Sequence, residues 1–188
     1  MLASVYIVRH TLVEVGPTTC YGASDVALAR SWPDEFAAVR AKLDALVPVD
    51  GTGDASPDLP TEGPLIVSSP LVRCAQLAEH LVEHLLPVAG EMHRSPAPAA
   101  GESSARCEWD PRLKEMHFGH WEMRPWREIP EADRQHWLDN VEDHTIPGGE
   151  SFGAVAKRAR EAYRGLRARL LGPNGPRHAV VVTHGGVI

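Results

Sequence analysis

The chain has 188 residues, enough for one large domain with a sizeable core. Hydrophobic residues make up 43% and charged residues 23%, which is typical of a soluble globular protein. The formal net charge of −6 argues against wholesale binding of nucleic acid or of an anionic membrane, so an anionic ligand must be held by a local cluster of cations.

The first half of the chain begins with a strand pattern. Residues 4–8 are mostly apolar and lack polar alternation, as expected of a strand buried on both faces of a sheet. The elements predicted next are a long loop at 11–31, a helix at 32–47 capped by Ser31, a surface excursion at 48–63, a short strand at 65–67 and a helix at 71–86.

The second half continues with a Pro/Ala/Gly-rich loop at 87–104, an edge strand within 105–113, an aromatic-rich loop at 114–130, a short helix near 131–140, a basic helix at 151–171 that Glu150 and Ser151 open, and a buried strand in HAVVVT. Strands that alternate with helices predict an α/β sheet with helices on both faces. No repeat or linker interrupts the pattern, so we expect a single domain over residues 1–188.

Cysteine usage and the N-terminal residues bear on the cellular compartment. Cys20, Cys74 and Cys107 are odd in number and far apart, which fits neither a disulfide framework nor a zinc knuckle. The N-terminus enters a strand pattern without the regions of a signal peptide, and no segment has 18 consecutive apolar residues. We therefore expect a reduced, cytoplasmic protein without a membrane or nucleic-acid partner.

Three predicted strands end in polar side chains. The first is followed by Arg9-His10-Thr11, the second by SSP with Arg73 a few residues on, and the third by His184 and two glycines. Ligands of open α/β sheets bind outside the carboxyl ends of the strands. If these strands are parallel neighbours, two arginines and two histidines meet there and form an anion site, for which the arginine fork matches phosphate oxygens.

Each of these residues also has a simpler interpretation. A lone histidine at a strand end is more often a hydrogen-bonded structural residue than a catalytic one, and Arg73 alone is most simply a solvated helix residue. The combination of RHT and THGG near opposite ends of the chain, with SSPLVR between them, favours the functional interpretation.

Several motifs in this order carry a family resemblance. VRHT, SSPLVRCAQLAEHL, LKEMHFGHWE, PGGESF and VVTHGG resemble the histidine phosphatase (phosphoglycerate mutase-like) superfamily. The resemblance implies a three-layer α/β/α sandwich with a mostly parallel central sheet. RHT in place of the commoner RHG, together with CYGASDVALA and GHWEMRPWREIP, is most similar to the α-ribazole phosphatases of cobalamin synthesis.

The resemblance implies a phosphohistidine mechanism with His10 as the nucleophile. Arg9, Arg73 and His184 would surround the phosphoryl oxygens, and His184 would serve best when protonated. Glu115 would protonate the leaving group and then activate water, whereas without the resemblance it is most simply a solvated loop carboxylate. The implied substrate-binding residues are Arg9, Thr11, Tyr21, Arg73 and Gly185.

The implied activity is hydrolysis of a small phosphate monoester without a cofactor or metal ion, with α-ribazole 5'-phosphate as the candidate substrate. A phosphoglycerate mutase and a broad-specificity sugar phosphatase are the alternatives among enzymes. A non-catalytic protein that binds a phosphorylated ligand would be favoured if the nucleophile or the acid were replaced, and neither is.

Some residues are assigned the simpler interpretation. His117 and His120 have a spacing that metal sites also use, but no cysteine or carboxylate pattern completes a site. The aromatic residues Phe118, Trp121 and Trp126 are expected to pack the loop, with the substrate pocket as the alternative. Cys20 and Tyr21 border that pocket by their position in the chain, and their roles stay open.

Two features depart from the family pattern. Met123 stands where relatives often have glycine, and the chain stops at Ile188, where relatives continue with a helix and more chain. The sequence therefore leaves open whether the domain is truncated there, and whether the protein is a monomer or a homodimer.

Overall fold

A computed structural model describes residues 3–47, 63–86 and 107–188 of the chain. The predicted excursion at 48–63, except for its last residue, lies outside the described residues. So does the predicted loop at 87–104, together with the first residues of the predicted edge strand.

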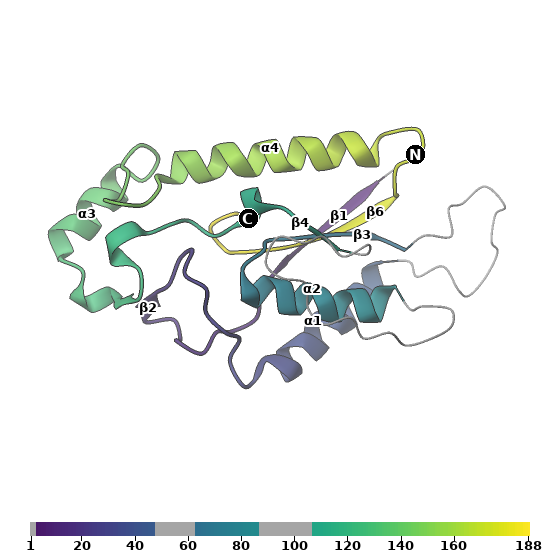
Figure 1. The fold of residues 1–188 in the computed structure, drawn as a ribbon, viewed down its shortest axis with the longest axis horizontal. Coiled ribbons are helices and arrows are strands. Elements are labelled where there is room, and N and C mark those ends of the chain that lie inside the picture. The colour runs from purple at the N-terminus through teal and green to yellow at the C-terminus, as the bar shows by residue number, and fades with distance from the viewer. Residues whose placement is uncertain (1–2, 48–62, 87–106) are drawn as a thin grey trace.

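Within the described residues, the central sheet contains four strands in the order β1-β6-β3-β4, and all three neighbouring pairs are parallel (Figure 1). The strands are β1 (Ser4–Arg9), β3 (Leu65–Ser68), β4 (Cys107–Trp109) and β6 (His178–Thr183). Each predicted strand is confirmed in position, and the one predicted at the edge is the edge strand β4. The prediction that the first strand is buried on both faces is wrong, because β1 is the outer strand at the other edge and its Ile7 is 51% exposed. Because β1, β6 and β3 are parallel neighbours, their polar carboxyl ends lie along one edge of the sheet.

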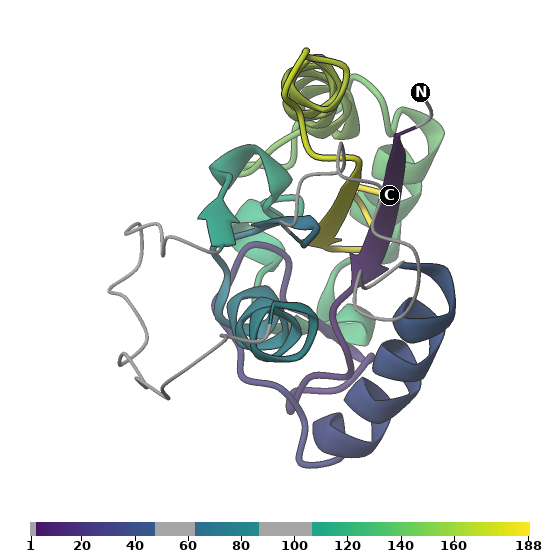
Figure 2. The same cartoon turned by 90° about the vertical axis from the view of Figure 1, so that its right-hand side faces the viewer.

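Helices cover both faces of this sheet. The helices α1 (Trp32–Leu46) and α2 (Val72–Leu85) lie on one face, and α4 (Phe152–Leu170) lies on the other (Figure 2). The residues of β6 alternate between two cores: Val180 packs in a cluster with Leu77 of α2, and Val181 packs in a cluster with Leu166 of α4. The predicted three-layer α/β/α sandwich with a mostly parallel sheet is confirmed.

The helices begin where the sequence predicted, within one residue, but their first turns differ. The Ser151 hydroxyl accepts a hydrogen bond from the Ala154 N–H at 3.2 Å and so caps α4. Ser31 occupies the cap position of α1, but its hydroxyl donates to Glu35 instead of accepting from the backbone. The predicted capping bond at Ser31 is therefore wrong, although the helix start is right.

Both segments predicted as loops, 11–31 and 114–130, contain short regular elements. The two-residue strands β2 (Thr19–Cys20) and β5 (Arg124–Pro125) pair antiparallel. The remaining elements are the 3₁₀ turns η1 (Pro111–Leu113), η2 (Gly119–Trp121) and η3 (Trp126–Glu128), and the helix α3 (Glu131–Asp139). Strands of two residues are too short for their alternation to show in the sequence.

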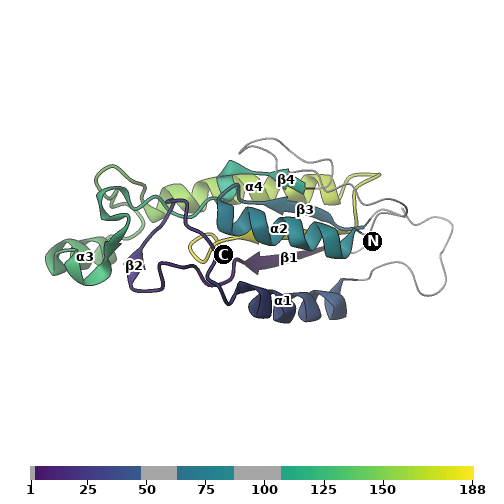
Figure 3. The same ribbon diagram turned by 60° about the horizontal axis from the view of Figure 1, so that its bottom comes forward.

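These short elements form a second layer of structure beyond the carboxyl ends of the strands. In Figure 3 the arrow of β1 points toward β2, with α3 further in the same direction. A third core cluster holds this region together and includes Cys20, Met116, Trp121 and Ile129. The packing role predicted for Trp121 is confirmed, since the side chain is 4% exposed.

Met123 has a φ of 61°, the one positive φ of a non-glycine residue in the described part of the chain. This conformation costs a residue with a Cβ about 1 kcal/mol, which explains why glycine suits the position. The Met123 N–H donates to the Cys20 carbonyl next to the β2–β5 pair. The departure from the family pattern therefore keeps the turn and adds local strain.

Within the described residues, no helix has the length and apolar character needed to cross a membrane.

Candidate active site

The carboxyl ends of β1, β6 and β3 bring His10, His184 and Arg73 together. The backbone N–H of His10 donates to the Thr183 carbonyl, and this bond continues the β1–β6 ladder by one residue. The Arg73 Nε–H donates to His10 Nε2 at 3.3 Å, and the ring centroids of His10 and His184 are 5.1 Å apart. His10 is 6% exposed, and the other two are completely buried.

The hydrogen bonds of His10 define its tautomer. Nδ1 lies 2.7 Å from the Thr11 carbonyl oxygen, which only accepts, so Nδ1 carries the proton. Nε2 is then unprotonated, and its lone pair accepts the hydrogen bond from Arg73. Burial, opposed by the bond to Thr11 and reinforced by Arg73, lowers the pKa of His10 to about 4. At neutral pH the ring is therefore uncharged and Nε2 is available as a nucleophile.

His184 contacts the side chains of two buried residues. Its Nε2 lies 2.8 Å from the Ser69 hydroxyl and 3.4 Å from the Cys74 sulfur. Burial, and then the charge of Arg73, lowers the pKa of His184 to about 2. The ring is therefore neutral at pH 7 when only protein groups surround it, unlike the protonated form expected from the sequence. A phosphate dianion beside the ring would raise this pKa.

The guanidinium of Arg73 is held by backbone carbonyls. It donates to Gly22 O at 2.6 Å and to Ser24 O at 2.8 Å, and its Cζ lies 5.0 Å from the centroid of the Tyr21 ring. Among the described residues, no carboxylate lies within ion-pair distance of Arg73. A buried cation without a counter-ion is costly, and a bound anion would offset that cost.

The carboxylate of Glu115 contacts the loop that follows β6. It accepts from the Met116 N–H at 2.9 Å and from the Gly186 N–H at 3.2 Å. A Cβ at Gly186 would lie 2.3 Å from Glu115 Oε1, so glycine is needed for this approach. The Gly186 N–H is thus bound to Glu115.

A second contact fixes the backbone around Glu115. The Arg158 guanidinium donates to the carbonyl of Glu115 at 3.1 Å and also to that of Lys114, and it forms an ion pair with Glu150 at 3.0 Å. Glu150 in turn accepts from the His117 N–H. The helix α4 therefore anchors the loop that carries Glu115.

A cavity of about 410 Å³ opens in front of His10, and it is lined by Arg9, His10, Thr11, Leu12, Val13, Gly16, Pro17, Thr19, Tyr21, Gly22, Glu35, Glu115, Phe118 and Trp126. Five of the predicted site residues are in this lining. Arg73 and His184 are not, because both are fully buried, and Gly185 is absent from it as well. A Cβ at Gly185 would lie 3.4 Å from the Arg9 guanidinium carbon, which is ordinary van der Waals contact, so Gly185 lies directly beside Arg9.

Thr11 has a hydroxyl that suits a ligand. The residue is 7% exposed and lines the cavity, and its Oγ1 has no hydrogen-bond partner in the described part of the chain. Buried polar atoms are nearly always hydrogen-bonded, so this one is available to an oxygen of a bound group. The observation agrees with the predicted substrate contact of Thr11.

The sequence left the roles of several neighbouring residues open. Phe118 and Trp126 pack against the third core cluster, as expected, with their ring centroids 5.5 Å apart. They also line the cavity, which was the alternative weighed for them. Tyr21 lines the cavity, whereas Cys20 is 1% exposed and belongs to the core. Ser69, which contacts His184, has no role predicted from its motif, and the carbonyls that hold Arg73 leave no signal in the sequence.

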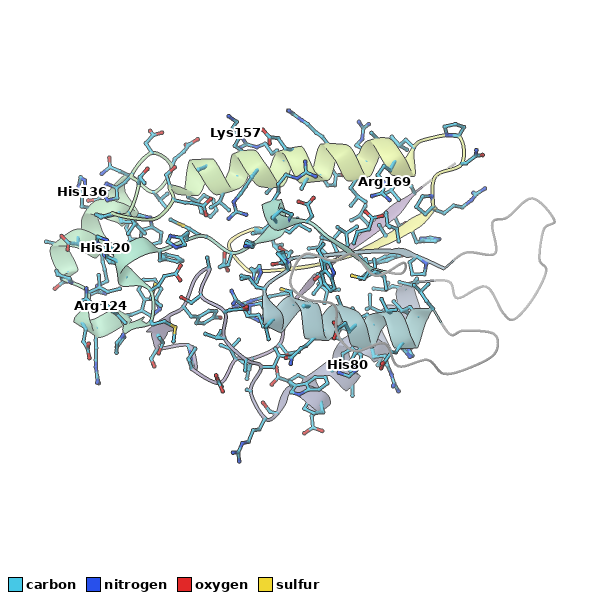
Figure 4. The ribbon with its side chains drawn as sticks, viewed as in Figure 1. His80, His120, Arg124, His136, Lys157 and Arg169 are labelled. Atoms are coloured by element: carbon cyan, nitrogen blue, oxygen red, sulfur yellow. The ribbon has the colours of Figure 1, made fainter. Side chains whose placement is uncertain are left out.

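Two further places carry none of the predicted catalytic residues. A larger hollow of about 870 Å³ lies between α4 and the sheet and is lined mainly by apolar side chains such as Val5, Val181 and Leu166. The second place holds His117 and His120. Nδ1 of His117 accepts from the Gly119 N–H, and His120 lies toward the α3 end of the molecule (Figure 4).

The two buried histidines predict a pH-dependent stability. The unfolded chain binds a proton at each histidine near pH 6.5, whereas the folded chain does so only near pH 4 at His10 and near pH 2 at His184. Stability is therefore complete above pH 6.5 and falls as the pH drops from 6.5 toward 4, by up to about 1.4 kcal/mol per pH unit for each histidine.

Denaturant unfolding between pH 7 and pH 5 measures this slope. In His184→Gln, the free energy of unfolding should depend less steeply on pH, because about one fewer proton is taken up on unfolding. The control His80→Gln, which changes a partly exposed histidine, should have the slope of the unmodified protein. An unchanged slope in His184→Gln would show that His184 titrates alike in both states.

The fold and the site together define an α/β protein in which histidines and arginines meet at the carboxyl edge of a parallel sheet. The chain belongs to the histidine phosphatase superfamily (branch 1), whose family model matches residues 5–188.

A curated relative is the adenosylcobalamin/alpha-ribazole phosphatase of Escherichia coli (strain K12), 36% identical over 81 residues. The alignment spans 42% of this chain and 38% of that relative, well under two thirds of its length.

Solved structures match more of the chain. A putative alpha-ribazole-5'-P phosphatase from E. coli K-12 matches with a TM-score of 0.66 at 21% identity, over 100% of this chain and 76% of that one. A mycobacterial glucosyl-3-phosphoglycerate phosphatase matches with a TM-score of 0.64 at 24% identity, over 97% of this chain and 74% of that one. At these identities the two structures support the fold alone.

Proposed function

We propose that the protein is a phosphatase that hydrolyses a small phosphate monoester through a phosphohistidine at His10, with α-ribazole 5'-phosphate as the candidate substrate. The observation that carries the proposal is a neutral His10, protonated on Nδ1, that lines one cavity together with Arg9, Thr11 and Glu115 and whose Nε2 lone pair accepts from Arg73. Membership of the histidine phosphatase superfamily supports it.

In the first step, Nε2 attacks phosphorus and the P–O bond to the leaving group breaks. Arg9, Arg73 and His184 stabilise the phosphoryl oxygens, which is the main task in phosphoryl transfer. The Arg73 Nε–H that contacts His10 Nε2 would then donate to a phosphoryl oxygen. The leaving oxygen takes a proton from the Glu115 carboxyl group, so an alcohol departs.

In the second step, water attacks the phosphorus of phosphohistidine. The Glu115 carboxylate, now deprotonated, takes a proton from that water, and the P–N bond breaks to release inorganic phosphate. His10 regains its lone pair and Glu115 its proton, so both groups return to their starting states. The Met116 and Gly186 N–H groups keep the carboxylate in place for both steps.

The walls of the cavity favour a neutral leaving group with apolar surface. Leu12, Val13, Pro17, Phe118 and Trp126 form much of the lining. Arg9 is the one arginine or lysine among the lining residues, and two carboxylates, Glu35 and Glu115, face the same space. A benzimidazole riboside suits such walls through stacking and apolar contact. The name of the curated E. coli relative supports this substrate.

The same walls disfavour the alternative activities. The carboxylate of 3-phosphoglycerate would face Glu35 and Glu115 with a single cation nearby, and the many hydroxyls of a sugar would meet apolar side chains. A purely binding protein would not need the Glu115 carboxylate fixed in the cavity that His10 lines.

A screen of phosphate monoesters in the presence of EDTA tests the proposal. We expect release of inorganic phosphate from α-ribazole 5'-phosphate to exceed that from 3-phosphoglycerate and sugar phosphates, and to persist in the chelator. The described residues contain no group of three or more His, Cys, Asp or Glu side chains placed to hold a metal ion. Activity that EDTA removes and a divalent ion restores would contradict the metal-independent mechanism.

A further inference from the structure

We propose that Glu122 is a positioning residue that holds the Arg73 guanidinium in its reactive orientation through the backbone of residues 22–24. The proposal rests on the proposed function only in taking Arg73 as a phosphate ligand. Glu122 is part of the GHWE motif, and no role is predicted for it from the sequence.

The orientation of the Arg73 guanidinium depends on residues 22–24, which contact it through backbone carbonyls and not through charged side chains. Two of the guanidinium nitrogens donate to the carbonyls of Gly22 and Ser24, and the third donates to His10. The fork of arginine is rigid and planar, so a shift of either carbonyl would rotate the donors that are meant for phosphate oxygens. The position of residues 22–24 therefore sets the position of Arg73.

Glu122 fixes that segment directly. Its Oε1 accepts from the Ala23 N–H at 2.9 Å, and its Oε2 accepts from the Ser24 hydroxyl. The same Oε1 also accepts from the Phe118 N–H at 2.9 Å. One carboxylate thus joins the turn that holds Arg73 to the loop that leads back to Glu115.

The close packing around Gly22 supports a specific fit. Gly22 has a φ of 38°, and a Cβ there would lie 2.6 Å from the Met116 carbonyl and 2.7 Å from Glu122 Oε1. The turn is therefore pressed against the segment 116–118, with the Glu122 carboxylate at the junction. Removal of the carboxylate would leave the Ala23 and Phe118 N–H groups without their acceptor and free the turn to move.

Binding of inorganic phosphate, measured by calorimetry, tests the proposal without requiring turnover. Glu122→Ala should weaken phosphate binding by about 10²-fold, because misplacement of a binding group by about 1 Å has effects of that order. Glu122→Gln should recover most of the affinity, since its carbonyl oxygen accepts from both N–H groups and its amide donates to Ser24. The control Glu131→Ala, at an exposed position in the first turn of α3, should bind phosphate normally.

A double-mutant cycle with Arg73→Lys separates positioning from general destabilisation. Lysine lacks the fork, so in that background Glu122→Ala should cause little further loss of phosphate affinity. An equal loss in both backgrounds, or unchanged phosphate binding in Glu122→Ala, would overturn the proposal. If Glu122→Ala does not fold, Ser24→Ala should weaken binding by about three- to tenfold through the loss of one hydrogen bond, and unaltered binding there would overturn it too. If the cycle shows the expected coupling between Glu122 and Arg73 but the protein hydrolyses no phosphate monoester, the result counts against the proposed function and not against the role of Glu122.

Discussion

Replacement of His10 by alanine is expected to abolish turnover and to remove acid-labile labelling of the protein by a phosphorylated substrate. The Nε2 lone pair of His10 is the atom that we assign to the bond with phosphorus, and no other group takes over a covalent step. Labelling with ³²P-substrate, followed by acid and base treatment, measures the phosphohistidine. The loss should be several orders of magnitude in turnover.

Two further variants make this result interpretable. His184→Ala should slow both labelling and turnover severely without abolishing them, because His184 contacts the site but does not form the bond. His80→Ala should behave as the unmodified protein, since this histidine lies on α2 away from the sheet edge (Figure 4). Undiminished acid-labile labelling of His10→Ala would show that another histidine is the nucleophile.

The sheet could be predicted because its strands carry an unmixed signal. The apolar runs of β3 and β6 are buried in the sheet as such runs predict, whereas β1 has an equally apolar run but leaves Ile7 51% exposed at the sheet's outer strand. Parallel neighbouring strands end at the same edge of a sheet, so the polar residues that follow them are expected to meet there. The structure places His10, Arg73 and His184 together as that inference requires.

The positions that orient these groups could not be predicted. Gly22 and Ser24 hold Arg73 through backbone carbonyls, which every residue has, so their residue types do not reveal this contact. The β2–β5 pair has two residues in each strand and forms because the segments meet in the fold. The neutral state of His184 follows from its depth of burial, which a sequence pattern does not contain.

Glu115→Gln is expected to separate proton transfer from phosphate binding. Glutamine keeps one carbonyl oxygen for the Met116 N–H but places an amide group toward the Gly186 N–H, so one of the two backbone contacts is lost. Such a loss costs about 1 kcal/mol of stability, which a melting curve would detect without loss of the fold. Inorganic phosphate should still bind, because Arg9, Arg73 and His184 are unchanged.

The kinetic effect should depend on the leaving group. General acid catalysis supplies about 10²–10⁴-fold, so turnover of an alkyl phosphate should fall by that factor. The phenolate of p-nitrophenyl phosphate leaves with little protonation, so labelling of His10 by this substrate should survive. Its second step still lacks a base for water, so phosphohistidine should accumulate and p-nitrophenol should appear as a burst, visible in stopped-flow absorbance. If Glu115→Gln slows phosphohistidine formation equally for both leaving groups, the carboxylate serves only to position its loop, and another group must deliver the proton.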